Sequence, residues 1–183
     1  MTVPRPKLIA ALAALYAATL GIAAVFAASD HLLLSAAIVL PLIWLSITDL
    51  ERQEIPDLAT ATIALAGVVF QWHLHGPTTS LMIPLVTAAA LTAAFWMAGA
   101  LYFQRQGTEA LGIGDAKLIG AGTLCIGATS VWAMLLLAAT GGITAALLAR
   151  RSASGSQGIA FGPFLAYAVF ILVNFPVQGL IPS

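Results

Sequence analysis

Residues 35–57 read SAAIVLPLIWLSITDLERQEIPD, and the change of composition at Asp49 decides the fold. Residues 35–48 carry no charge, whereas residues 49–57 hold four carboxylates and one arginine. A long apolar run without charge is typical of a helix inside a membrane, and clustered charges mark the point where the chain meets water. We therefore predict a transmembrane helix over residues 32–48, followed by a polar connection that begins at Asp49.

The composition of the whole chain follows the same pattern. Of 183 residues, 61% are apolar and only 8% are charged, against about 25% charged residues in a soluble domain. The net charge is zero, so the chain has no basic field that would attract nucleic acid. The one cysteine, Cys125, excludes an internal disulfide framework and a zinc site built from several cysteines. Lipid is therefore the solvent and partner that we expect.

Further uncharged runs predict the remaining spans at residues 8–28, 58–72, 81–103 and 159–175. Residues 116–149 are too long for one span, and Gly127 to Ser130 is the predicted break. The arm before this break covers only about 20 Å of helix, so it is either a partial span or one that starts deep in the membrane. The first run is longer than the apolar region of a signal peptide, so we interpret it as a retained anchor. The prediction is an all-α bundle of six to seven spans, with residues 1–183 as a single domain.

The basic residues predict the orientation of this bundle. If the chain crosses the membrane seven times, every lysine and arginine falls on one side: Arg5, Lys7, Arg52, Arg105, Lys117, Arg150 and Arg151. Because basic residues collect on the cytoplasmic side, we expect the N-terminus and both polar connections to be cytoplasmic. A re-entrant segment at residues 116–128 would place the last two arginines outside, which argues against that alternative.

Two carboxylates stand out because each lies at the boundary of a span. Asp49 directly follows one uncharged run, and Asp115 directly precedes another, at the same predicted side of the membrane. Two carboxylates that come close cannot both ionise, so they share a proton. Such a pair can activate a water and protonate a leaving amine. This is the chemistry of aspartic proteolysis, and we expect Asp49 and Asp115 to be catalytic, with no metal or cofactor.

Three motifs carry a resemblance to a known family. The segment GIGDAKL, residues 112–118, resembles the GxGD element of membrane aspartyl proteases. Asp49 followed by Ile55-Pro56-Asp57 resembles the other active-site segment of the type IV prepilin peptidases, and FGPFLA, residues 161–166, resembles their Gly-Pro-Phe segment. The order of the three motifs along the chain is also that of the family.

The resemblance implies an endopeptidase of the bacterial inner membrane. Its implied substrates are prepilins or pseudopilins, cut on the cytoplasmic side after a glycine that ends a short basic leader. Many members also have a cysteine-rich region associated with N-methylation of the new N-terminus. Since this chain has one cysteine, we expect the compact, peptidase-only form without N-methyltransferase activity.

The motifs extend the expected site to supporting residues: Pro56, Asp57, Gly112, Gly114, Lys117, Gly162, Pro163 and Phe164. We expect Asp57 to cap the helix of the third span. Lys117 is either an interfacial lysine whose stem lies along apolar surface or a cation that tunes the aspartate pair. Glycines at 112 and 114 allow close approach of the backbone. Pro163 and Phe164 either face the active site or only kink and pack their helix.

Three other functions compete with this interpretation. The first alternative is a signal-peptide-peptidase-like protease that cuts within transmembrane helices. In that family the first aspartate follows a tyrosine within a span, whereas here Thr48 precedes Asp49 at a span boundary. A small proton-coupled transporter would use the carboxylates as a relay. A scaffold protein would leave the GIGD segment without a purpose. His73 and His75 lack further ligands for a metal and are expected to be interfacial. The substrate and the oligomeric state do not follow from the sequence.

Overall fold

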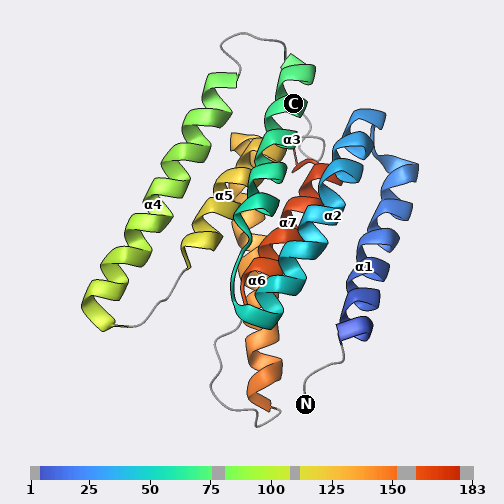
Figure 1. The fold of residues 1–183 in the computed structure, drawn as a ribbon. Coiled ribbons are helices and arrows are strands. Elements are labelled where there is room, and N and C mark those ends of the chain that lie inside the picture. Colours follow the sequence, from blue (N-terminus) through green and yellow to red (C-terminus); the bar gives the residue numbers. More distant parts are fainter. Residues whose placement is uncertain (1–4, 76–80, 108–111, 152–159, 178–183) are drawn as a thin grey trace.

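The computed structural model describes residues 5–75, 81–107, 112–151 and 160–177, and within these ranges the chain is helical, with no strand. The α-helices are α1 (Arg5–Phe26), α2 (Ser29–Arg52), α3 (Asp57–His75), α4 (Met82–Gln106), α5 (Ile113–Ile126), α6 (Val131–Arg151) and α7 (Gly162–Asn174). They run up and down along one bundle (Figure 1). The predicted all-α fold class is confirmed.

Within the described residues, four helical stretches are long and apolar enough to cross a membrane: Pro6–Phe26, Ser29–Arg52, Met82–Gln106 and Ala128–Leu148. The protein is therefore a polytopic membrane protein. The predicted break in the long apolar run is also confirmed. Helix α5 ends at Ile126, Gly127 has a φ of +79°, and a short 3-10 helix, Ala128–Ser130, precedes α6. Glycine adopts this positive φ without steric cost.

The two shortest helices form the centre of the bundle. Helix α5 has 14 residues and α7 has 13, and they pack against each other. Around them, α3 and α4 contact α5, while α2 and α6 contact α7. Gly67 of α3 lets α5 approach closely, because a methyl group there would lie 2.8 Å from the backbone nitrogen of Cys125. Small residues permit this approach between membrane helices, and it holds the two central helices in place.

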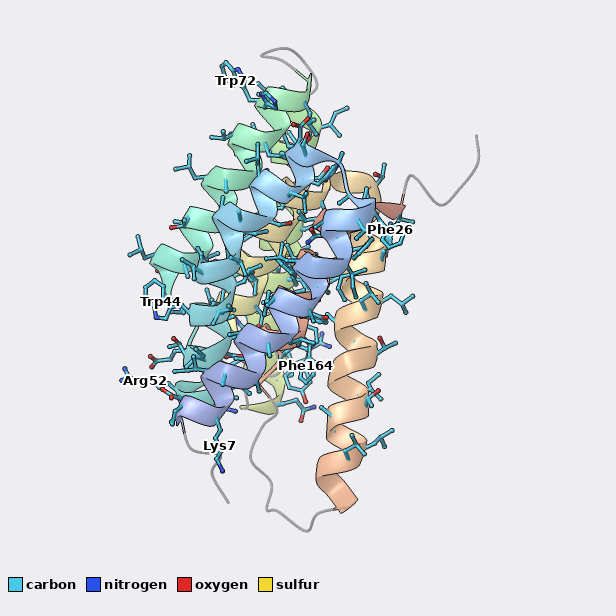
Figure 2. All side chains as sticks on the ribbon, turned by 90° about the vertical axis from the view of Figure 1, so that its right-hand side faces the viewer. Lys7, Phe26, Trp44, Arg52, Trp72 and Phe164 are labelled. Atoms are coloured by element: carbon cyan, nitrogen blue, oxygen red, sulfur yellow. The ribbon has the colours of Figure 1, made fainter. Side chains whose placement is uncertain are left out.

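The helix ends that carry basic residues lie at one end of the bundle. Figure 2 shows Lys7 and Arg52 at this end, whereas Phe26 and Trp72 lie at the other. Arg105 is in the last turn of α4, which reaches the same end in Figure 1. Helix α5 begins further inside the bundle than the lower ends of α4 and α6 (Figure 1). We name the end with Lys7 and Arg52 the basic end.

Candidate active site

Asp49 lies in the last turn of α2 and is 5% exposed. Helix α2 stops three residues later, where Gln53 adopts a left-handed conformation (φ +56°) and its N–H donates to the Asp49 carbonyl at 2.9 Å. The Asp49 carboxylate thus lies at the C-terminal end of its own helix, α2. The helix dipole disfavours a negative charge at this end. A buried carboxylate in this position requires a stabilising partner from elsewhere in the fold.

That partner is the first residue of α7. The Gly162 N–H donates a hydrogen bond of 2.9 Å to Asp49 Oδ2, across 113 residues of sequence. The N-terminus of a helix carries unpaired N–H groups and a partial positive charge, both of which favour an anion. A methyl group on Gly162 would lie 2.7 Å from the same carboxylate oxygen. The glycine is thus required by close approach to Asp49.

Asp115 lies in the first turn of α5, outside the four spanning helices. Burial and the neighbouring Asp49 carboxylate raise the pKa of Asp115 to about 6, and a hydrogen bond from the Gly112 backbone opposes this rise. Its Oδ1 atom is buried and has no hydrogen-bond partner among the described residues. Since buried polar atoms are nearly always paired, this oxygen is available for a water or a substrate group.

The structure thus brings the two predicted catalytic aspartates together from α2 and α5. They lie near enough for their charges to interact. One carboxylate oxygen is fixed by a backbone N–H, and one oxygen of the partner is open. Two carboxyl groups that interact can share a proton, and the oxygen without a partner can bind a water or a substrate group; general acid–base hydrolysis uses both features.

Of the two glycines in the GIGD segment, Gly114 is closely packed, whereas a methyl group on Gly112 would lie no nearer than 3.7 Å to another atom. Gly112 has a φ of −68°, a value that any residue can adopt, so no left-handed turn is needed there. A methyl group on Gly114 would lie 2.7 Å from the Ile55 Cβ. Ile55 belongs to the connection between α2 and α3, so Gly114 lets that connection reach the start of α5.

Lys117 and Asp57 form an ion pair beside the site. Lys117 Nζ donates to Asp57 Oδ1 at 2.7 Å, and both side chains are solvent-exposed. Asp57 is the first residue of α3 and not the residue that precedes the helix, so its carboxylate joins α3 to α5 where a cap was expected. Pro56 precedes the helix, and its carbonyl accepts from the Thr60 N–H at 3.2 Å.

The remaining residues of the FGPF segment have different surroundings. Pro163 lies in the first turn of α7, where its missing N–H and fixed φ suit a helix start. Phe164 packs against α6, since a methyl group on Gly141 would lie 2.9 Å from its ring. Of this segment, Gly162 is the residue in contact with Asp49, and Phe164 is directed towards α6 (labelled in Figure 2).

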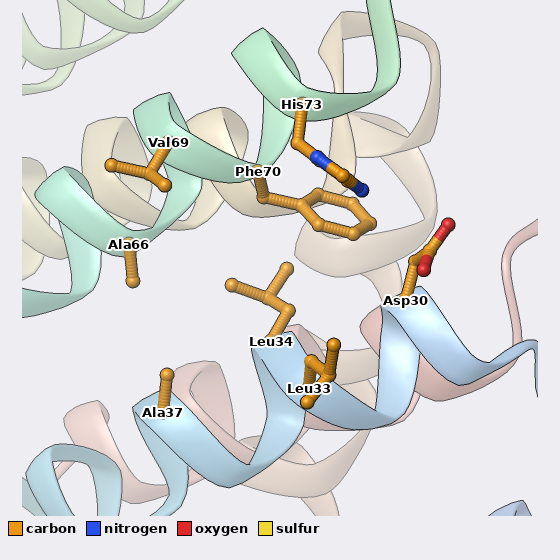
Figure 3. A pocket seen from close by; sticks show the side chains of 8 residues that line it. All are labelled: Asp30, Leu33, Leu34, Ala37, Ala66, Val69, Phe70 and His73. Carbon is orange, nitrogen blue, oxygen red and sulfur yellow. The ribbon is translucent and has the colours of Figure 1, made fainter.

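A cavity at the opposite end of the bundle has Asp30 and His73 in an otherwise apolar lining. It measures about 270 Å³ and is lined by Asp30, Leu33, Leu34, Ala37, Ala66, Val69, Phe70 and His73 (Figure 3). It lies between α2 and α3 and is almost entirely apolar. Among the described residues, no three histidine, cysteine or acidic side chains are grouped as metal ligands. The side chain of His75 lies outside the described part of the structure.

Two contacts of the site were not predicted from the sequence. Gly162 and Ile55 both belong to the quoted motifs, but their contacts were not predicted. The Gly162 N–H donates to Asp49, and the Ile55 side chain lies beside Gly114. A glycine directly before a proline at a helix start was the available signal for the first contact.

The comparisons with known proteins match the region of the chain that contains both aspartates. Residues 36–149 match the type IV leader peptidase family, a range that contains Asp49 and Asp115 and ends before α7. No solved structure gives a significant match.

Curated relatives are similar over the same region. A prepilin leader peptidase/N-methyltransferase of Pectobacterium carotovorum subsp. carotovorum is 32% identical over 127 residues, 68% of this chain and 45% of that protein. Proteins of the same name from Dickeya chrysanthemi (33% over 124 residues, 67% of this chain and 43% of the relative) and Neisseria gonorrhoeae (30% over 131 residues, 72% and 44%) are also similar. The matched region spans less than half the length of these relatives. Because the family match covers more than half of this chain, the chain belongs to the type IV leader peptidase family.

Proposed function

We propose that this protein is a prepilin leader peptidase, an aspartic endopeptidase that uses Asp49 and Asp115. The observation that carries the proposal is the pairing of buried Asp49 with half-buried Asp115, whose buried Oδ1 atom has no partner among the described residues. The family match and the names of the relatives support prepilin-like proteins as substrates. The exposed acidic residues Glu51 and Glu54 at the basic end suit a leader peptide with positive charge.

The surroundings of the two aspartates suggest their roles. The Gly162 N–H and the N-terminus of α7 favour a charged Asp49, whereas the raised pKa of Asp115 favours its protonated form. In the proposed mechanism, ionised Asp49 takes a proton from water while the water oxygen attacks the peptide carbonyl carbon. Asp115 donates its proton to the carbonyl oxygen at the same time.

The second half of the reaction returns both groups to their starting forms. The C–N bond of the tetrahedral intermediate breaks, and the proton held by Asp49 passes to the leaving amine. Asp115 recovers a proton from the intermediate's hydroxyl group as the new carboxyl group forms. One water is consumed, and neither a metal nor a covalent intermediate takes part.

We also propose the setting of this reaction. Cleavage follows a glycine at the end of the leader, at the cytoplasmic face of a bacterial inner membrane. The collection of basic helix ends at one end of the bundle (Figure 2) supports this face. Residues 1–183 would act as one peptidase domain, because the buried side chains of the described helices form one cluster.

The decisive experiment uses purified full-length protein in detergent with a prepilin-like protein, with products identified by mass spectrometry. Asp49→Asn and Asp115→Asn should each lower cleavage by at least about a thousandfold, within the range lost with general acid–base groups. Asp30→Asn, at the opposite end of the bundle, is the matched control and should cleave normally. Retained cleavage in either active-site variant would refute the mechanism. Proton flux in reconstituted vesicles without cleavage would favour the transporter instead.

A further inference from the structure

The Ile55 side chain lies between the first turn of α5, which carries Asp115, and the first turn of α7, which binds Asp49. Its Cβ, Cγ1 and Cδ1 atoms lie 2.7, 3.2 and 3.3 Å from the position of a methyl group on Gly114, the residue before Asp115. Its Cδ1 atom also lies 3.3 Å from the position of a methyl group on Gly162, whose N–H binds Asp49. The one side chain therefore touches the backbone next to both carboxylates.

The connection that carries Ile55 is held on both sides. Before it, the Gln53 N–H donates to the Asp49 carbonyl at 2.9 Å. After it, Pro56 restricts Ile55 to an extended backbone, and Asp57 is paired with Lys117 at 2.7 Å. A β-branched side chain is also stiff about χ1. Ile55 is consequently a rigid group on a fixed piece of backbone.

We infer that Ile55 is a positioning residue, a spacer between Gly114 of α5 and Gly162 of α7 that sets the separation of the Asp49 and Asp115 carboxylates. The inference rests on the proposed function for its effect on catalysis. Glycine on each side brings the backbones against the spacer, so the width of one isoleucine side chain fixes the distance across the site. A shared proton requires that distance to be held closely, because a shift of about 1 Å can cost about a hundredfold in rate.

Ile55 could instead be only a part of the apolar core, since it also packs against that core. Ile63 of α3 is the matched comparison, because it is the same residue type, is fully buried and lies in the core cluster. Shortening a core isoleucine to alanine lowers stability in either case. Only a spacer changes the interaction between the two carboxylates.

The test compares Ile55→Ala, Ile55→Leu and Ile63→Ala in the full chain. The protonation of the two aspartates is followed by infrared titration of the carboxyl band, with Asp49→Asn and Asp115→Asn spectra as references, and cleavage kinetics are measured in parallel. In Ile55→Ala the two glycine backbones approach, so the two protonation steps of the pair should separate further, by roughly half a pH unit for each ångström of approach.

In the same variant kcat should fall by about ten- to a hundredfold with KM changed less than about twofold. Ile55→Leu should restore most of kcat because it keeps the volume, and Ile63→Ala should lower Tm without moving the protonation steps. Unchanged steps in Ile55→Ala, or an equal change in Ile63→Ala, would overturn the inference. If the wild type cleaves no prepilin but Ile55→Ala still moves the protonation steps, the proposed function fails and the spacer stands.

Discussion

The last turn of α2 and the first turn of α5 each present one aspartate, but the two turns treat it differently. Asp49 is buried, whereas Asp115 is half-buried. Asp49 stands at the unfavourable end of its own helix and is stabilised by the Gly162 N–H. Asp115 stands at the favourable end of its helix, yet one of its oxygens has no partner within the described structure. In the proposed mechanism, the first environment holds the ionised carboxylate and the second holds the protonated one. On this proposal, a pair of chemically identical side chains acquires two roles from backbone geometry.

Among the changes that test this difference between the two aspartates, the largest effect is expected from blocking the contact of Asp49 with Gly162. In Gly162→Ala the new methyl group would lie 2.7 Å from Asp49 Oδ2, so the carboxylate must move or lose its hydrogen bond. We expect kcat for prepilin cleavage to fall by about a hundredfold, the size of effect seen when a catalytic group is displaced or loses a fixed donor.

Gly21→Ala of α1 is the control for this change, because no atom lies within 4 Å of its new methyl group. It should leave cleavage unchanged and should favour the helix slightly. If both variants cleave at the wild-type rate, the Gly162 N–H does not distinguish Asp49 from Asp115.

Some parts of this comparison could be predicted from the sequence, and others could not. The break at Gly127 and the position of Asp49 and Asp115 at the ends of apolar runs follow from local composition, because lipid excludes charge over a fixed length of helix. The contacts of Gly162 with Asp49 and of Asp57 with Lys117 join residues 113 and 60 positions apart. The sequence does not predict which helices contact one another, because these helices are apolar on every side and lack a polar face that would indicate their neighbours.

The short central helices illustrate the same limit. A span in contact with lipid must match the thickness of the bilayer, but α5 and α7 are enclosed by other helices and need not do so. Most residues of both helices are buried, nine of 14 in α5 and nine of 13 in α7. Their lengths therefore depend on where the site is placed and not on the hydrocarbon core, which is why α5 can present Asp115 inside the bundle.

The next effect concerns Asp115 and stability. A folded-state pKa of about 6 in place of 3.8 means that the native state holds a proton that the unfolded chain has released between these pH values. Stability should therefore fall as the pH rises from about 4 to 6 and remain lower above it. Asp115→Asn removes the contribution of Asp115 to this dependence, so its Tm at pH 7 should exceed that of the wild type by about 2–4 °C.

The measurement is a thermal unfolding series in detergent from pH 4 to 8, with Asp30→Asn as the reference. The wild type and the reference should lose stability together as the pH rises, while Asp115→Asn should lose clearly less over the same range. A parallel decline in all three proteins would show that Asp115 is not held in its protonated form by the fold. Since Asp115→Asn is also expected to be inactive, a gain in stability would identify the carboxylate as kept for chemistry at a cost to the fold.

The smallest effect comes from the ion pair beside the site. Lys117 and Asp57 are 43% and 78% exposed, and an exposed pair contributes about 0–1 kcal/mol. Lys117→Met should therefore change the free energy of unfolding little and lower kcat by no more than about fivefold, through looser docking of α3 on α5. Asp57→Asn should have the same small effect, and the double variant should be no worse than either single one, because all three lose the same interaction. Lys117→Met alone could instead lose as much activity as Asp115→Asn. That result would mean that the lysine acts on the carboxylate pair directly and not through Asp57.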